Sequence, residues 1–400
     1  MNQSFHRVIY TFIGIFGNLS IIYLCFNNYG IDLLSDFSKG ALIFQYLFLV
    51  NEWGFNLYAL QNIKSQTKII NKQVVNEIIF SKLLLGFANL IFIALLFLLD
   101  VIVFNNPYMV FFLIFITFSS ALNPLWFFQA IGRIELLNLP LLLLKLSQIL
   151  FLYLLIGSWD VGLFFILQGI VFISLFSYNL HSLNKLYRYK FEINHPNFLL
   201  GISGIKKMKT HFLSNLHNHL NLTLWGVFLI VISSPFQIIV FNLVDTIYRG
   251  MNSIFQAIIE PIFRSIDLNL KVLIYFFLFS VIILIPIYHF MPFLSHLFFP
   301  KFSNDLIEIF RLLSILLAIL FVSKVFTYFS LGKENIAKMN KFNIQFLFIE
   351  IFLVVIWYLF MQNSVKEIIL LLLFLNLMKI SLLVLFKLFP QSANFLKLRD

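Results

Sequence analysis

The sequence contains very little cysteine and very little charge. It has one cysteine, Cys25, in 400 residues, which excludes an internal disulfide and a cysteine-based metal site. Charged residues make up 11% of the chain and hydrophobic residues 61%, with a mean hydropathy of +0.95. Soluble domains contain about 25% charged residues. A single water-soluble domain is therefore excluded, and the composition is that of a polytopic membrane protein.

Several catalytic and binding motifs are also missing. The sequence has no Walker-type phosphate loop, no dinucleotide-binding glycine motif and no nucleophile elbow, so we expect neither ATP-driven transport by this chain alone nor an enzyme. His217 and His219 lack nearby carboxylate or cysteine ligands, and we expect no metal and no cofactor. No long outer loop is present to hold catalytic carboxylates, which disfavours a polysaccharide polymerase.

Twelve apolar stretches fill the chain almost from end to end. A hydrocarbon core about 30 Å thick requires roughly 20 apolar residues of helix, and each stretch is read as one crossing. The eighth is short and carries Glu260, Pro261 and Arg264. The predicted spans are 8–26, 41–60, 83–99, 108–128, 136–156, 161–180, 222–244, 251–266, 272–294, 307–329, 342–360 and 368–389.

The longest connection between spans is polar and basic, and it divides the spans six and six. We therefore predict an all-α polytopic membrane protein of about 12 transmembrane helices in two six-helix bundles around a central cavity. The bundles are residues 1–181 and 222–400, and residues 182–221 form a basic cytoplasmic linker. This plan is typical of transporters built from two repeats, although no residue-level repeat is found.

The distribution of Lys and Arg predicts the orientation, because positive loops stay on the cytoplasmic side. With both termini cytoplasmic, that side holds twenty Lys and Arg residues, Lys82 among them, whereas the opposite side holds Lys39, Arg249, Lys301 and Lys366. The formal net charge of +11 is therefore interpreted as topology, and we expect no nucleic acid partner.

Ionisable side chains inside the spans are candidates for function. A charged side chain at mid-depth costs at least roughly 2.5–3.5 kcal/mol on insertion scales, so it normally faces a cavity or a partner. Lys145 and Lys379 are predicted to line the cavity. Glu52, Glu260 and Glu350 are either groups that take up and release protons during a transport cycle or structural partners of the buried lysines.

Two further charges near the ends of a span have simpler interpretations. Arg311 is expected to form a local ion pair with Glu308, which precedes it by one helical turn. Lys324 is expected to extend its ammonium group to the nearby membrane surface.

Two motifs accompany these charges. One runs Asn123-Pro124-Leu125-Trp126-Phe127-Phe128-Gln129, where the proline predicts a kink and Trp126 an anchor at the membrane surface. The other runs Trp53-Gly54-Phe55-Asn56-Leu57-Tyr58-Ala59. They resemble signatures of the second and fourth spans of Wzx-type flippases, which move O-antigen or capsule repeat units. The departures are Trp53 in place of Tyr, and Ala130 where the family usually has Gly.

The resemblance implies a substrate and partners. The substrate would be an oligosaccharide linked through pyrophosphate to undecaprenol, moved across the bacterial cytoplasmic membrane by alternating access. The partners would be membrane lipids, a polysaccharide polymerase and a chain-length regulator. The rival functions are a small-molecule or drug antiporter of the same superfamily and a polysaccharide polymerase. The implied substrate-binding residues are Lys145, Lys379, Arg133, Trp126 and Gln129.

Overall fold

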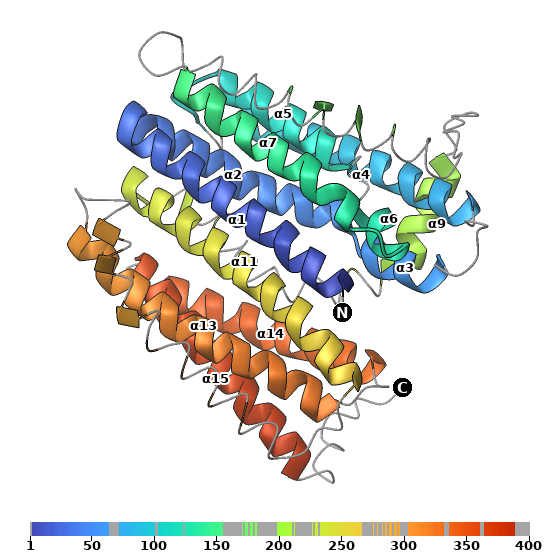
Figure 1. Cartoon of the computed structure of the whole chain (residues 1–400). Helices are drawn as coiled ribbons and strands as arrows, with labels where there is room; N and C mark the ends of the chain where they lie inside the picture. The colour runs from blue at the N-terminus through green and yellow to red at the C-terminus, as the bar shows by residue number, and fades with distance from the viewer. Residues whose placement is uncertain are drawn as a thin grey trace. The chain divides into compact units, whose positions relative to one another are not determined.

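The computed structural model of the chain is all-α (Figure 1). It describes residues 2–63, 72–100, 103–121, 123, 125–154, 198–209, 233–265, 303–331, 336–360 and 364–388, together with isolated residues between 170 and 296. Twelve helices and no strand occur among these residues, which confirms the predicted fold class. The helices are α1 (Asn2–Tyr29), α2 (Ile31–Glu52), α3 (Phe55–Asn62), α4 (Lys72–Leu98), α5 (Tyr108–Ala121), α6 (Leu125–Ala130), α7 (Glu135–Leu154), α9 (Phe198–Lys207), α11 (Pro235–Ser265), α13 (Ser303–Leu331), α14 (Ile336–Phe360) and α15 (Val365–Leu388).

Five of the described helices are long and apolar enough to cross a bilayer. They contain the segments Ser4–Asn28, Ile31–Glu52, Gln73–Leu98, Glu135–Leu154 and Leu306–Phe326. The helices do not match the predicted spans one for one. The second predicted span is divided between α2 and α3, and the fourth between α5 and α6. Both divisions fall at the flippase-like motifs.

The second half corrects the prediction of two spans at 222–244 and 251–266. The structure instead has one continuous helix, α11, across the connection that was expected around Arg249. Its first residue is Pro235, a residue favoured in the first turn because its missing N–H would be unbonded there anyway. Arg249 is compatible with the helix because its guanidinium lies 2.7 Å from the Asp245 carboxylate, one turn earlier.

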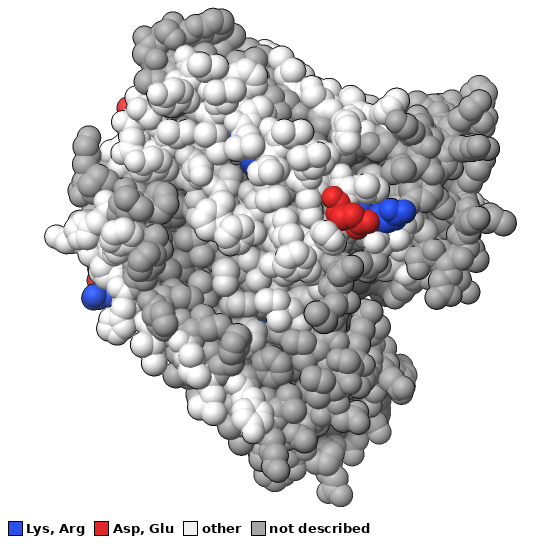
Figure 2. Space-filling view, viewed as in Figure 1, with Lys and Arg blue, Asp and Glu red and all other residues white. Residues whose placement is uncertain are grey.

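Helix α4 has polar residues on its buried face and apolar residues on its exposed face. Its exposed stripe is Phe87, Ile91, Leu95 and Leu98, which are 56%, 63%, 49% and 78% exposed. Its buried polar residues are Glu77, Ser81, Lys82 and Asn89. A soluble protein rarely exposes such a stripe, whereas a lipid bilayer covers it. Figure 2 shows one face of the molecule, on which few of the described side chains are charged.

The chain divides into two compact units. One is Ile9–Leu243, and the other is Val244–Asp400 together with Gln3–Val8. In the first unit α2, α4 and α5 pack against one another, α3 packs against α6, and α9 packs against α4. In the second unit α13 packs against α14 and α15. Helix α9 lies in the segment predicted as the linker.

Candidate functional site

The chain leaves helical geometry at the first motif. Helix α2 ends at Glu52, and the next two residues have positive φ, 25° at Trp53 and 79° at Gly54. Glycine adopts the left-handed conformation without penalty, but a tryptophan does so at a cost of about 1–3 kcal/mol. The positive φ of Trp53 therefore marks a break that surrounding contacts must hold in place.

The second motif also forms a break, between α5 and α6. The backbone N–H of Leu125 donates to Asn123 Oδ1 at 3.1 Å, so the Asn123 side chain caps the start of α6. Gly132, with φ of 74°, ends the short helix and donates its N–H to the Gln129 carbonyl at 3.2 Å. Pro124 lies outside the described residues.

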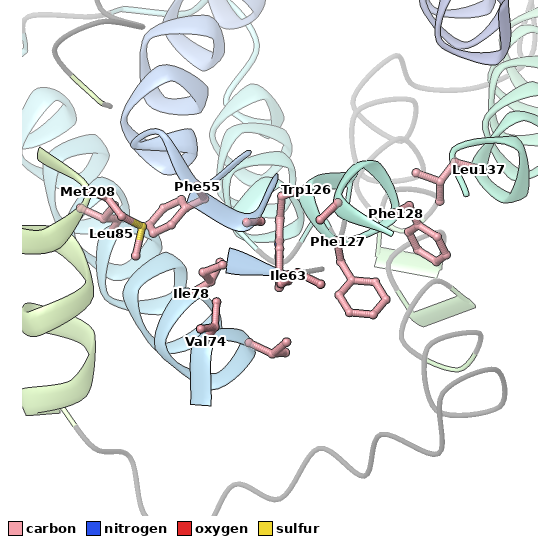
Figure 3. Close-up of a cluster of buried hydrophobic side chains, with 13 residues drawn as sticks. Phe55, Ile63, Val74, Ile78, Leu85, Trp126, Phe127, Phe128, Leu137 and Met208 are labelled. Carbon is pink, nitrogen blue, oxygen red and sulfur yellow. The ribbon is translucent and has the colours of Figure 1, made fainter. Parts of the chain in front are cut away.

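The two breaks meet in one buried hydrophobic cluster, which we call the motif cluster (Figure 3). Trp126 is 3% exposed within it, so its ring packs against protein, which contradicts the expected role of an exposed anchor. Its buried members are Phe55, Ala59, Ile63, Val74, Val75, Ile78, Leu85, Trp126, Phe127, Phe128, Ala130, Leu137 and Met208. The α3 and α6 segments are far apart in the sequence, and packing brings them together.

A buried ion pair lies beside this cluster. The Lys82 ammonium is 2.9 Å from Glu52 Oε1 and 5.6 Å from the centroid of the Phe55 ring. Lys82 is 1% exposed, and Tyr10 of α1 is an electrostatic neighbour of Glu52. The sequence analysis placed Lys82 in a cytoplasmic connection, which the structure corrects because α4 begins already at Lys72.

The continuous helical pattern from Gln73 onward was the signal that could have identified Lys82 as a buried residue. The structure gives Glu52 a lysine partner. This agrees with the alternative in which the carboxylates of the spans are structural partners of buried lysines. That partner is Lys82 rather than either of the two deep lysines.

Uncharged polar residues fix α2 just before its break. The Asn51 amide donates to Ser120 Oγ of α5 at 2.7 Å, and the Asn89 amide of α4 donates to Asn51 Oδ1 at 2.7 Å. All three side chains are buried. Sequence reasoning missed this network because it weighed the cost of burying charged side chains and not that of burying uncharged polar ones. It joins three helices at the level of Glu52, so the break starts from a fixed position.

The segment that contains α9 contacts the first break through Trp53. The Trp53 indole N–H donates to the Ile205 carbonyl at 3.0 Å, and its ring stacks on Phe212 at 3.8 Å between centroids. The Lys207 ammonium donates to Glu77 at 2.6 Å. That hydrogen bond raises the pKa of Lys207 above its usual value. These contacts tie α9 and Phe212 to the motif cluster.

Lys145 lies on α7 and packs across α1. Its ammonium donates to Asn18 Oδ1 at 2.7 Å. A Cβ added at Gly17 would approach within 2.6 Å of the Lys145 side chain, so the glycine leaves the space that the aliphatic stem occupies. The side chain is 9% exposed, which places this cation inside the protein of the first unit.

The second unit has its own group of buried charges, carried by α13, α14 and α15. Lys379 is 9% exposed and lies 5.7 Å from the centroid of the Phe346 ring. Glu350, which is 4% exposed, and Lys324 are both electrostatic neighbours of Lys379. Tyr248 of α11, also a neighbour of Glu350, is hydrogen-bonded to Asn376 of α15. Lys379 therefore has both a carboxylate, Glu350, and a second lysine, Lys324, as electrostatic neighbours.

The remaining predicted residues are scattered. Arg133 is exposed and lies 3.8 Å from Glu135, and Gln129 is half-buried next to the motif cluster. The side chain of Glu260 lies outside the described residues.

The expected ion pair of Arg311 with Glu308 is not formed. The Glu308 carboxylate is 2.5 Å from Lys366, whereas Arg311 lies over the Tyr288 ring at 5.3 Å. In the part of the chain that the structure describes, no group of three His, Cys, Asp or Glu side chains is arranged to hold a metal.

Comparison with solved structures relates this fold to known transporters. An inward-facing multidrug resistance MATE family transporter of the MOP superfamily aligns with a TM-score of 0.64 and 13% identity, over 99% of this chain and 100% of that chain. An outward-facing one aligns with a TM-score of 0.57 and 12% identity, over 98% and 94%. A mutant of a Vibrio cholerae MATE transporter aligns with a TM-score of 0.57 and 11% identity, over 99% and 96%.

The chain thus has a MATE-like transporter fold over nearly its whole length. Searches with the sequence found no matching protein family and no matching curated protein.

Proposed function

We propose that this protein is a membrane transporter that works by alternating access, and that its cargo is an oligosaccharide linked to a lipid through pyrophosphate. The transport function is supported by the fold, since the chain aligns over nearly its whole length with MATE transporters described as inward-facing and as outward-facing. The lipid-linked cargo is supported by one observation above all. The two flippase-like motifs, distant in the sequence, form a single packed cluster beside a buried ion pair.

In this proposal the motif cluster holds the two helix breaks in a fixed arrangement. Breaks in membrane helices are tolerated only where neighbouring protein satisfies the backbone, and the breaks at Trp53 and Asn123 support each other through the packed α3 and α6. Trp126 lies in the interior of the motif cluster. Arg133 and Gln129, which remain accessible, are the motif residues that contact cargo.

The pyrophosphate is bound by buried lysines. A Lys ammonium is a compact cation that attracts phosphate strongly in a water-poor site. We assign this role to Lys145 in the first unit and Lys379 in the second. Glu350 lies beside Lys379, so its protonation state changes the charge that the cargo meets. Glu52 and Glu260 remain proposed proton-coupling groups.

Complementation tests the proposal. The gene is expressed in a bacterial strain that lacks its own O-antigen flippase, and surface polysaccharide and the leaflet position of lipid-linked repeats are measured. Restored polysaccharide supports the cargo, and repeats trapped on the cytoplasmic leaflet despite normal protein levels contradict it. We place the protein in the cytoplasmic membrane with both termini inside, next to a polymerase and a chain-length regulator.

A small-molecule antiporter is the second candidate, and it is favoured by the description of the aligned MATE transporters as multidrug resistance proteins. Drug resistance without restored polysaccharide in the same strain would support it. The two outcomes are measured in parallel on the same cells.

A further inference from the structure

Helix α9 presents two different faces. Its inner face consists of Gly201, Gly204, Ile205 and Met208, of which both glycines and Met208 are buried. A Cβ added at Gly201 would lie 3.2 Å from the Phe80 carbonyl oxygen of α4, and Ser81 Oγ donates to the Gly201 carbonyl at 2.9 Å. The helix is therefore in close contact with α4 along this face.

The outer face carries a stripe of a different kind. Leu199 and Ile202 are 79% and 42% exposed, and Lys206 and Lys209 are exposed. Their spacing of three, four and three residues places them on one side of a helix. Helical backbone hydrogen bonds continue beyond the end of α9. The N–H of Met208 donates to the Gly204 carbonyl, and the N–H of Phe212 donates to the Met208 carbonyl. We call these four residues the outer stripe.

The stripe changes from apolar to basic along the helix. Its apolar end comes first, and the two lysines follow within about two turns. Lys207 is not part of it, because its ammonium donates to Glu77 of α4. Figure 1 shows α9 beside α3 and α4 of the same unit.

We propose that the outer stripe binds an anionic phospholipid of the bilayer. A helix face that combines exposed aliphatic and basic side chains is suited to the membrane interface, where acyl chains cover the former and headgroup phosphates meet the latter. Clustered lysines next to a membrane span attract anionic lipids in particular. Leu199 and Ile202 contact the acyl chains, whereas Lys206 and Lys209 contact the phosphate. This assignment does not depend on the identity of the cargo.

The contacts between α9 and the rest of the unit fix the position at which the lipid would bind. Trp53, Ser81 and Glu77 each bond to the α9 segment, so the outer stripe is presented by a helix fixed to the first break. The bound lipid then lies against the linker that carries α9.

A fluorescence experiment tests the proposal on the full-length protein. Ser203, half-buried on α9 next to the stripe, is changed to cysteine in a Cys25→Ser background and labelled with an environment-sensitive dye. The protein is reconstituted in phosphatidylethanolamine vesicles with about 30% phosphatidylglycerol. A spin-label quencher is placed on the acyl chain of one lipid or the other, at equal mole fraction.

We expect the quencher on phosphatidylglycerol to be about twofold more effective than the quencher on phosphatidylethanolamine, because the lysines enrich the anionic lipid locally. The K206Q/K209Q variant should lose this difference, and K206R/K209R should keep it. Lys366→Gln, which removes an exposed lysine of α15, should leave it unchanged.

Equal quenching by labelled phosphatidylglycerol and labelled phosphatidylethanolamine, in the protein that keeps Lys206 and Lys209, would overturn the proposal regardless of the results with the variants. No quenching by either labelled lipid would also overturn it, since the face would then be covered by protein or water. A preference for phosphatidylglycerol that survives in K206Q/K209Q would show that other groups attract the lipid, and would likewise remove the assignment.

Discussion

The Lys82 ammonium lies 2.9 Å from Glu52 Oε1, inside the first unit and next to the point where α2 ends. Lys82 comes from α4, so the pair joins the end of one helix to the middle of another. Removing one partner of a buried ion pair leaves an uncompensated charge and costs about 3–5 kcal/mol. This pair therefore holds the first break in position.

The pair predicts a strong coupling between two substitutions. Lys82→Met alone should lower the thermal unfolding temperature clearly, because Glu52 is then buried without its cation. Glu52→Gln in the same chain should recover most of the loss, since the double variant buries no net charge. Thermal unfolding of the four purified proteins in detergent measures the cycle. Additive losses in the double variant would show that the two side chains do not depend on each other.

Gly17 predicts a local effect on Lys145. Gly17→Ala should push the lysine stem away, since the added Cβ would lie 2.6 Å from it, and the hydrogen bond to Asn18 should be lost. Gly14→Ala is the matched control on the same helix, because a Cβ at Gly14 meets nothing within 4 Å. Alanine favours a helix over glycine by about 1 kcal/mol, so Gly14→Ala should be neutral or stabilising. Equal unfolding temperatures for the two variants would contradict the packing.

Trp53→Phe should loosen α9 without disturbing the rest of the unit. Phenylalanine can still stack on Phe212, but it cannot donate to the Ile205 carbonyl, so one anchor is removed. Hydrogen exchange followed by mass spectrometry should show faster exchange in residues 198–209 and unchanged exchange in α7. Wild-type protection of α9 in the variant would mean that the hydrogen bond is dispensable.

The Lys207 pair predicts a dependence on alkaline pH. The pKa of Lys207 is raised by its hydrogen bond to Glu77, so the contact is fully present below the usual lysine pKa of about 10.4 and is lost as the pH rises through the raised value. The difference in unfolding temperature between wild type and Lys207→Gln should therefore stay constant up to about pH 10 and shrink above it. A difference in unfolding temperature that already shrinks between pH 8 and pH 9 would contradict a raised pKa of Lys207.

The proposed cargo contacts predict a loss of transport without a loss of protein. Lys145→Gln and Lys379→Gln should each slow flipping of lipid-linked repeats by about tenfold or more, since a hydrogen bond to a charged group contributes about 1.5–3 kcal/mol. Lys366→Gln is the control that removes an exposed lysine. Unchanged flipping in the double Lys145→Gln and Lys379→Gln variant would remove both residues from the binding site.

Much of the fold can be predicted from the sequence because the relevant signals are local. Long apolar runs predicted helices of membrane length, and Gly54 and Asn123 lie where helices are interrupted. The prediction was wrong at Arg249, where a charge was taken to mark a connection. One turn earlier Asp245 neutralises that charge, and the helix continues. Trp126 was placed at the surface for a similar reason, because tryptophan is common there, whereas the structure packs it against α3.

The amino-acid sequence by itself determined that this chain is an all-α membrane protein, since hydrophobic length and helical periodicity are properties of neighbouring residues. Only the tertiary structure decided which charges meet. Glu52 with Lys82, and Glu77 with Lys207, are joined across segments distant in the chain, and the packing of several helices sets those distances. The same packing brings the two motifs into one cluster. The sequence could not show this, because a contact between remote segments does not change the hydrophobic periodicity of either segment.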